Sequence, residues 1–118
     1  MAAARAPAET RPRETVFLLV CHDAPGSAAP REAHMHGHLA FIERHVDRIL
    51  VAGPALDAAN AIDASVFVVR AADEADARAL LEGDPYFQNG VWARIEARRF
   101  RAVCGSAMGG ITWAPVGP

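Results

Sequence analysis

Four stretches of the chain have the hydrophobic patterns of β-strands. Residues 15–21 (TVFLLVC) form a continuous apolar run, which is typical of a strand covered on both faces or central in a sheet. Residues 48–54 (RILVAGP) stop at a Gly-Pro turn, and residues 65–70 (SVFVVR) are mostly β-branched. Residues 91–100 alternate, so that one predicted face holds Val91, Ala93, Ile95 and Ala97 and the other holds Trp92, Arg94, Glu96 and Arg98.

Two segments have helical patterns. The first begins at Pro30, where the missing N–H costs nothing, and runs to about residue 46. Its apolar residues are spaced by four, three and four positions and predict one stripe that faces the core: Met35, Leu39, Ile42 and Val46. The second helix is residues 74–82, which we expect Asp73 to cap and Gly83 to end in a left-handed conformation.

The remaining segments show no element of their own. Residues 56–65 read as a polar, turn-rich connection, residues 1–14 as a disordered N-terminal tail and residues 105–118 as a loose C-terminal tail. In that last tail Ile111 and Trp113 are apolar enough to pack on something, for example a partner subunit. A single domain over residues 15–104 therefore holds all the predicted elements.

The order of elements is β-α-β-β-α-β, which predicts an α+β, ferredoxin-like fold with a four-stranded antiparallel sheet. Two helices cover one face of such a sheet, and the other face looks too apolar for water, which predicts a homodimer through the sheet faces, or a higher oligomer. Cys21 and Cys104 then lie at opposite ends of the sheet, so we expect no disulfide between them. We interpret both as buried thiols, with a redox or nucleophilic role as the alternative.

Composition excludes several classes of function. The chain has 118 residues, 52% hydrophobic and 22% charged, as in an ordinary single globular domain. All 12 basic residues are Arg, so chemistry that needs a lysine nucleophile is excluded. The net charge of -2 gives no basic footprint for nucleic acid. Since no apolar run approaches the roughly 20 residues of a membrane span, we expect no membrane association and a cytoplasmic location.

Three histidines alternate in the sequence HMHGH: His34, His36 and His38. A helix turns about 100° per residue, so His38 lies roughly 60° and His34 roughly 100° to one side of the apolar stripe, while His36 points the other way. This divergence weakens a metal site. His34 and His38 could still supply two ligands, with His22 or Asp84 as a third, and a His-rich metal protein therefore stays as one alternative.

Asp84 lies between a glycine and a proline, where an aspartate that caps a short turn is expected. A capping carboxylate keeps lone pairs that can accept from an imidazole, so capping and function can coexist. Gly37 in a helix interior costs roughly 1 kcal/mol against Ala and suggests a close approach by another element or a ligand. Gly53 is most simply a turn glycine with positive φ.

The segment from Val16 to Val103 resembles the YciI-like (YCII-related) proteins. The resemblance rests on His38-Leu39 in a helix, AGP (52–54) fourteen residues after that histidine, a strand near Ser65, LLEGDPY (80–86), NGVW and a basic RRFRAV end. It covers about three quarters of the chain and implies a dimeric α/β-barrel fold. It also implies a His-Asp pair at a candidate active site.

Carried over by motif, that pair is His38 and Asp84. The helix of family members often carries two arginines ahead of the histidine. Arg31 matches the first by position, Met35 stands in place of the second, and the small residue before the histidine is Gly37. Met35 removes a charge from the site that the resemblance implies.

These residues favour a cofactor-independent enzyme acting on a small cyclic or aromatic molecule. His38 would be the general acid/base, with Asp84 accepting from its other ring nitrogen. We expect Arg31 to hold a phenolate or carboxylate. The further substrate-binding candidates are His34, Gly53, Pro54, Ser65 and Tyr86, with Phe87 and Trp92 as possible apolar walls.

Proton abstraction leading to elimination or isomerisation suits a lone His-Asp pair, a preference that also rests on analogy with fold relatives, which include small-molecule isomerases and dehydrohalogenase-like enzymes. The chain has neither a nucleophile elbow nor a Gly-rich phosphate loop beside the histidine. We expect no cofactor. The runner-up hypothesis is a non-catalytic dimer that binds a metabolite, because both functions need an apolar pocket with a few polar groups.

Overall fold

A four-stranded antiparallel sheet forms the framework of the fold in the computed structural model, which describes residues 14–112. Its strands are β1 (Glu14–Asp23), β2 (Ile49–Leu56), β3 (Ile62–Val69) and β4 (Trp92–Ala102), in the order β2-β3-β1-β4. Helix α1 (Ala28–Arg44) follows β1 and continues into a 3-10 turn, η3 (Val46–Arg48). Helices α2 (Glu74–Glu82) and α3 (Pro85–Gln88) precede β4. This order confirms the predicted α+β, ferredoxin-like fold.

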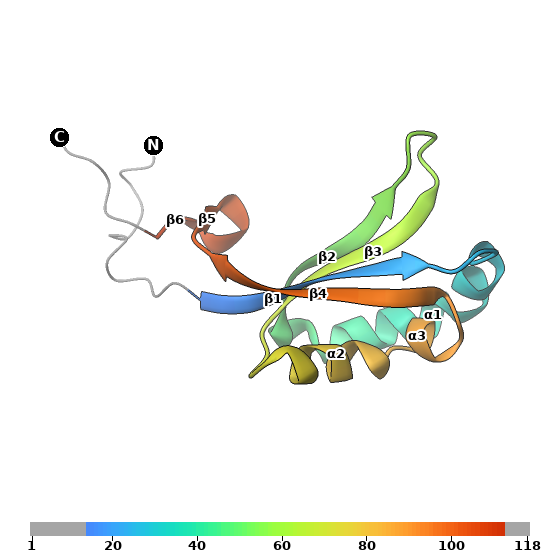
Figure 1. The fold of residues 1–118 in the computed structure, drawn as a ribbon, viewed down its shortest axis with the longest axis horizontal. Coiled ribbons are helices and arrows are strands. Elements are labelled where there is room, and N and C mark those ends of the chain that lie inside the picture. The colour runs from blue at the N-terminus through green and yellow to red at the C-terminus, as the bar shows by residue number, and fades with distance from the viewer. Residues whose placement is uncertain (1–13, 113–118) are drawn as a thin grey trace.

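The helices all lie on one face of the sheet, and the core fills the space between them (Figure 1). Alternate residues of β1 point to this face, among them Phe17, Leu19 and Cys21. The buried cluster draws on all three helices and three of the strands: Phe17, Leu19, Cys21, Phe41, Phe67, Val69, Ala77, Leu80, Leu81, Tyr86, Val91 and Trp92. Among the described residues, no helix is both long and apolar enough to cross a membrane.

Helix α1 buries a different side from the predicted one. The predicted core stripe is largely exposed, with Met35 44%, Leu39 47% and Val46 57% accessible, whereas Phe41 is buried. On a helical wheel Phe41 lies roughly 120° from Met35. Met35, Leu39 and Ile42 of this stripe line a cavity, and of these three Ile42 also packs against the core, so the prediction that the whole stripe faces the core was wrong. The helix also begins two residues before Pro30.

The two glycines for which a positive φ was predicted, Gly53 and Gly83, do not have one. Gly83 ends α2 with φ −80°, in the right-handed region, and Gly53 lies inside β2 and not in a turn. The turn comes later, because β2 and β3 extend beyond their predicted ends to Leu56 and back from Ile62. Asp57 holds this hairpin together, since its carboxylate accepts from the backbone N–H groups of Ala59 and Ala61.

The N-terminal caps of α2 and α3 follow the prediction. The Asp73 carboxylate accepts from the N–H of Asp76, at 2.8 Å. The Asp84 carboxylate accepts from the N–H of Tyr86, also at 2.8 Å, with Pro85 in the first position of the helix. An aspartate satisfies a backbone donor that the helix itself leaves unpaired. The second cap therefore fixes Asp84 at the N-terminal end of α3, the helix that lies next to α1.

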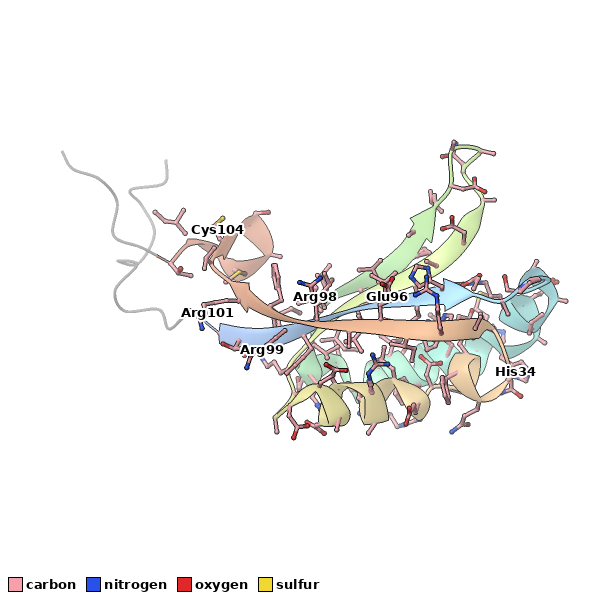
Figure 2. All side chains as sticks on the ribbon, in the orientation of Figure 1. His34, Glu96, Arg98, Arg99, Arg101 and Cys104 are labelled. Carbon is pink, nitrogen blue, oxygen red and sulfur yellow. The ribbon has the colours of Figure 1, made fainter. Side chains whose placement is uncertain are left out.

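The second face of the sheet is free of helices (Figure 1). The strand registers place Leu18, Val20, Val66 and Val68 together on it, and all four are half-buried. From β4 it receives Glu96 and Arg98 (Figure 2), so the predicted alternation holds over that stretch. Trp92 departs from it: a register shift at His22/Asp23 lets its side chain turn into the core.

The ends of the domain differ from the prediction in two places. Glu14, assigned to the tail, begins β1, and residues 1–13 lie outside the described part of the chain, as does Trp113. Residues 105–111, predicted as the start of a loose tail, form a small hairpin together with Cys104. It consists of β5 (Cys104–Gly105) and β6 (Gly110–Ile111) around a 3-10 turn, η4 (Ser106–Met108). Positive φ values at Gly105 and Gly109 suit that tight path.

The two cysteines are free and far apart, as expected. Cys21 pairs with Ile95 near one end of the sheet, whereas Cys104 follows the end of β4 that pairs with Glu14. Cys21 is buried, but Cys104 is exposed, so the prediction of a second buried thiol was wrong.

Candidate functional site

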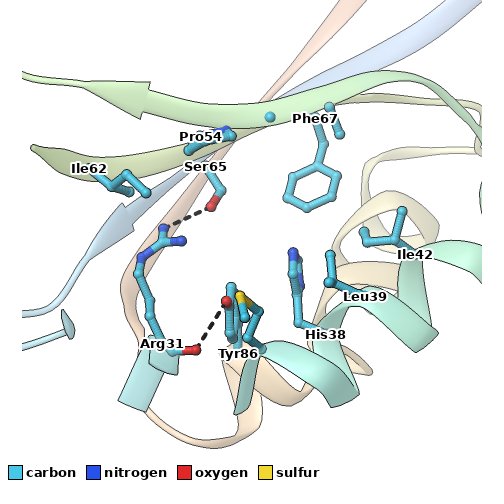
Figure 3. A pocket seen from close by; sticks show the side chains of 12 residues that line it. Arg31, His38, Leu39, Ile42, Pro54, Ile62, Ser65, Phe67 and Tyr86 are labelled. Atoms are coloured by element: carbon cyan, nitrogen blue, oxygen red, sulfur yellow. Dashed lines mark hydrogen bonds between the residues drawn. The ribbon is translucent and has the colours of Figure 1, made fainter. Parts of the chain in front are cut away.

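A cavity of about 340 Å³ lies between α1 and the β2–β3 hairpin (Figure 3). This size suits a small organic ligand, since such pockets usually measure roughly 300–1,000 Å³. The helix provides one wall and the two strands the other. Its lining is Arg31, Met35, His38, Leu39, Ile42, Ala52, Gly53, Pro54, Ile62, Ser65, Phe67 and Tyr86.

His38 and Asp84 meet at the base of this cavity. The Nδ1 atom of His38 lies 2.7 Å from Oδ2 and 3.0 Å from Oδ1 of Asp84. The Asp84 side chain is fully buried and that of His38 is 15% exposed. A carboxylate accepts and cannot donate, so Nδ1 carries the proton and Nε2 is left unprotonated in the neutral ring. The pair therefore presents a basic nitrogen beside the cavity.

Tyr86 fixes the plane of the imidazole. The two rings are stacked, with centroids 3.9 Å apart and an angle of 6° between the planes. The tyrosine hydroxyl donates to the backbone carbonyl of Arg31, at 3.2 Å (Figure 3). Burial raises the pKa of this hydroxyl above its usual value. Tyr86 therefore stays uncharged, and its ring lies between His38 and Arg31.

Arg31 is held by an aspartate that the sequence reasoning missed. Asp23 at the end of β1 accepts from Nε and Nη2 of Arg31, both at 2.8 Å, and from the Ser27 hydroxyl at 2.7 Å. Burial raises the pKa of Asp23, but the hydrogen bonds from Arg31 and Ser27 outweigh it and hold the pKa below its usual value. The bond to Asp23 also raises the pKa of Arg31. The sequence signal that could have identified Asp23 as the partner of Arg31 is a charged residue at the end of a predicted strand, eight residues before the arginine.

Ser65, Gly53 and Pro54, three of the residues predicted to bind substrate, line the opposite wall. The Ser65 hydroxyl accepts from Nη2 of Arg31 at 2.9 Å, which ties the helix to β3 (Figure 3). Pro54 pairs with Ser65 across β2 and β3, so both side chains face the helices. Gly53 has no side chain and lines this wall with its backbone.

The apolar walls come from residues that were assigned to other roles. Met35, Leu39 and Ile42 of α1 face Ile62 and Phe67 across the cavity. Trp92 lies behind the wall, edge-on to His38 at 6.4 Å and to Tyr86 at 6.0 Å between ring centroids. Phe87 is 38% exposed and does not line the cavity. The predicted apolar walls Trp92 and Phe87 therefore do not line the cavity.

His34 is not part of the cavity lining. It lies roughly 100° from Met35 around the helix, toward the side on which Phe41 is buried, so its assignment to substrate binding is corrected. His36 is exposed, and His22 pairs with Glu96 on the helix-free face. Within residues 14–112, no three His, Cys, Asp or Glu side chains converge as metal ligands.

Cys21 lies in the core below the site and is poorly suited to nucleophilic chemistry. Burial, together with the negative charges of Asp84 and Asp23, raises the pKa of its thiol to about 12. The thiolate is the reactive form, so this cysteine stays inert near neutral pH.

Comparisons with known proteins show which family the chain belongs to. No curated protein matches the chain. Among solved structures, the chain is similar to 5-chloro-2-hydroxyhydroquinone dehydrochlorinase (TftG) from Burkholderia phenoliruptrix AC1100, in complex with 2,5-dihydroxybenzoquinone. The identity is 27% and the TM-score 0.67, over 77% of this chain and 96% of that one. The model of the YCII-related domain matches residues 15–101, and the chain therefore belongs to the YCII-related domain family.

Proposed function

We propose that this protein is a cofactor-independent enzyme that removes a proton from a hydroxylated aromatic or quinonoid molecule and so expels a leaving group. The observation that carries the proposal is the His38–Asp84 pair at the base of an apolar, ring-sized cavity. The dehydrochlorinase with a similar structure acts on a chlorinated hydroxyhydroquinone, which supports this class of substrate.

His38 is the general acid/base in this proposal. Its Nε2 accepts a proton from a ring hydroxyl, and Asp84 stabilises the imidazolium that forms. The stack on Tyr86 holds the ring in place, so little reorganisation is needed when substrate enters. Arg31 places a donor near a substrate oxygen on the same side of the cavity.

An elimination of this kind is balanced without an external oxidant. His38 takes the proton of one ring hydroxyl and returns it to the ring carbon that bears chlorine. The C–Cl bond then breaks, chloride leaves with both electrons, and the second hydroxyl loses its proton. The ring becomes a quinone as C–Cl is replaced by C–H, and the net loss is HCl. No redox cofactor is required.

Turnover and binding of the His38→Ala variant test this role. A panel of chlorinated hydroquinones is incubated with wild type, and chloride release is measured alongside binding by calorimetry. We expect His38→Ala to retain binding and to lose at least about 100-fold in kcat. His36→Ala, an exposed histidine of the same helix, is the matched control and should behave as wild type. Binding without turnover by wild type would favour the alternative, a metabolite-binding module.

We also propose that the protein is a homodimer formed through the helix-free face of the sheet. Leu18, Val20, Val66 and Val68 meet on that face, with Val51 of β2 beside them at 55% exposure. Contiguous apolar surface of this kind usually marks an interaction site. The mixed charges of Glu96 and Arg98 at one side suit pairing with a second copy of the same face.

A further inference from the structure

We infer that the cavity selects ring substrates that carry no carboxylate or other permanent anionic group. The inference rests on the proposed function, because it names the substrate class of the same site. It follows from how the charges around the cavity are arranged and from the apolar character of the remaining lining.

The charged groups around the cavity have no net positive charge. Of the described residues that line the cavity, Arg31 and His38 are the two with basic side chains. Each is bound to a buried carboxylate, Asp23 for Arg31 and Asp84 for His38. The four groups together carry one net negative charge when the imidazole is neutral, and none when it is protonated.

Arg31 is the residue that could recognise an anion, but most of its donors are already used. Nε and Nη2 are bound to Asp23, and Nη2 also donates to Ser65. The side chains of Arg31 and Asp23 are 14% and 6% exposed, so the pair is well shielded from solvent. The two remaining N–H groups are both on Nη1 and point in different directions from that one nitrogen, which suits one neutral oxygen of a phenol or a quinone. Bidentate capture of a carboxylate needs parallel N–H groups from two different guanidinium nitrogens, and Nε and Nη2 already give theirs to Asp23.

The rest of the lining opposes a second charge. Met35 follows Arg31 by one helical turn and lines the cavity with an apolar side chain, and Leu39 and Ile42 continue that wall. A carboxylate placed here would lose its hydration without gaining a counter-ion, which is unfavourable. A phenol does not meet this problem, because transfer of its proton to His38 creates phenolate and imidazolium together and leaves the total charge unchanged.

The test uses two probes that differ in this one feature. 2,5-Dihydroxybenzamide and 2,5-dihydroxybenzoate have the same ring and nearly the same shape, but only the benzoate is ionised at neutral pH. Binding of each to the full chain is measured by calorimetry, for wild type and three variants. Met35→Arg adds one positive charge at the cavity, Asp23→Asn removes one negative charge beside it, and Met35→Leu is the control that keeps the wall neutral.

We expect wild type and Met35→Leu to bind the amide at least about tenfold more tightly than the benzoate. Met35→Arg should reduce that ratio to about one or reverse it, because Met35 is 44% exposed and tolerates a longer side chain. Asp23→Asn should move the ratio in the same direction.

Three results would overturn the inference: equal or tighter binding of the benzoate by wild type, an unchanged ratio in both charge variants, or no binding of either probe. A failure of the proposed function is distinguishable from these. Amide preference without turnover of any chlorinated hydroquinone would refute catalysis and leave the inference standing. Chloride release together with preference for the benzoate would do the reverse.

Discussion

At the scale of single residues, Asp84 serves structure and chemistry with different lone pairs. One oxygen accepts from the N–H of Tyr86 and caps α3, and the other lies nearest to Nδ1 of His38. In the Asp84→Asn variant the amide oxygen can still cap the helix. Its weaker, neutral contact no longer stabilises an imidazolium. We expect kcat to fall by about 10²- to 10⁴-fold while the thermal midpoint changes little.

Asp73→Asn is the control for that experiment. Asp73 caps α2 in the same manner but does not line the cavity. If both variants lose activity equally, the loss reflects capping, and the role given to Asp84 is wrong.

Asp23 makes folding sensitive to acid in a defined direction. Its folded pKa lies below the ordinary value of 3.8, so the bond to Arg31 stabilises the fold above that pH and is lost as the pH falls through the folded pKa. Asp23→Asn should lower the free energy of unfolding by roughly 2–4 kcal/mol near neutral pH. In urea titrations, the gap between wild type and variant should narrow toward about pH 3. A gap that widens in acid would contradict the assignment.

The two cysteines should react very differently with iodoacetamide. The Cys21 thiol is buried and its pKa is about 12, so almost no thiolate forms in mild alkali. Cys104 is exposed. Mass spectrometry of the folded protein at about pH 8 should find modification at Cys104 and none at Cys21. In denaturant both should react, and early labelling of Cys21 without denaturant would show that the core opens readily.

At the scale of elements, α1 shows where sequence periodicity reaches its limit. The spacing of Met35, Leu39 and Ile42 correctly indicates an apolar helix face, but a helical wheel does not say whether that face meets the core or a cavity. The core instead takes Phe41, whose single large side chain carries little periodic signal. The pair of Asp23 and Arg31 was missed for a related reason. The chain turns between these two residues, so their spacing in the sequence does not show that their side chains meet.

Gly37 couples α1 to α3. A Cβ atom at this position would lie 3.3 Å from Cγ of Pro85, the residue next to Asp84. Gly37→Val should therefore push α3 away, cost about 1–3 kcal/mol of stability and lower kcat at least about tenfold by loosening the His38–Asp84 contact. Melting curves and chloride release measure the two effects.

The matched variant is Ala40→Val, on an exposed position of the same helix. It introduces the same β-branched side chain without the contact to Pro85. Valine lies below alanine but above glycine in helix propensity, so propensity alone would lower stability in Ala40→Val and would not lower it in Gly37→Val. Equal effects of the two substitutions would mean that the close approach has no importance for the site.

At the scale of the whole molecule, strand order and helix placement could be predicted because the apolar runs and the caps are local signals. The His38–Asp84 pairing came from the family resemblance and from the freedom of a capping carboxylate to accept a second bond. The cavity could not be predicted, because it depends on how far α1 stands from β2 and β3. The hairpin at residues 104–111 was missed because its glycines were interpreted as a sign of a loose tail. They instead adopt the positive φ values that a tight hairpin needs.

The sheet face that carries no helix gives the last prediction. Val66 lies at its centre between β2 and β1, so Val66→Asp would place a charge where the proposed dimer excludes water. We expect wild type to sediment as twice the 12.6 kDa chain and Val66→Asp as a monomer with a circular dichroism spectrum close to that of wild type. Val46→Asp alters an exposed valine next to α1 and should leave the dimer intact. A monomeric wild type, or a Val66→Asp variant that dimerises as tightly, would show that another surface or no partner covers these valines.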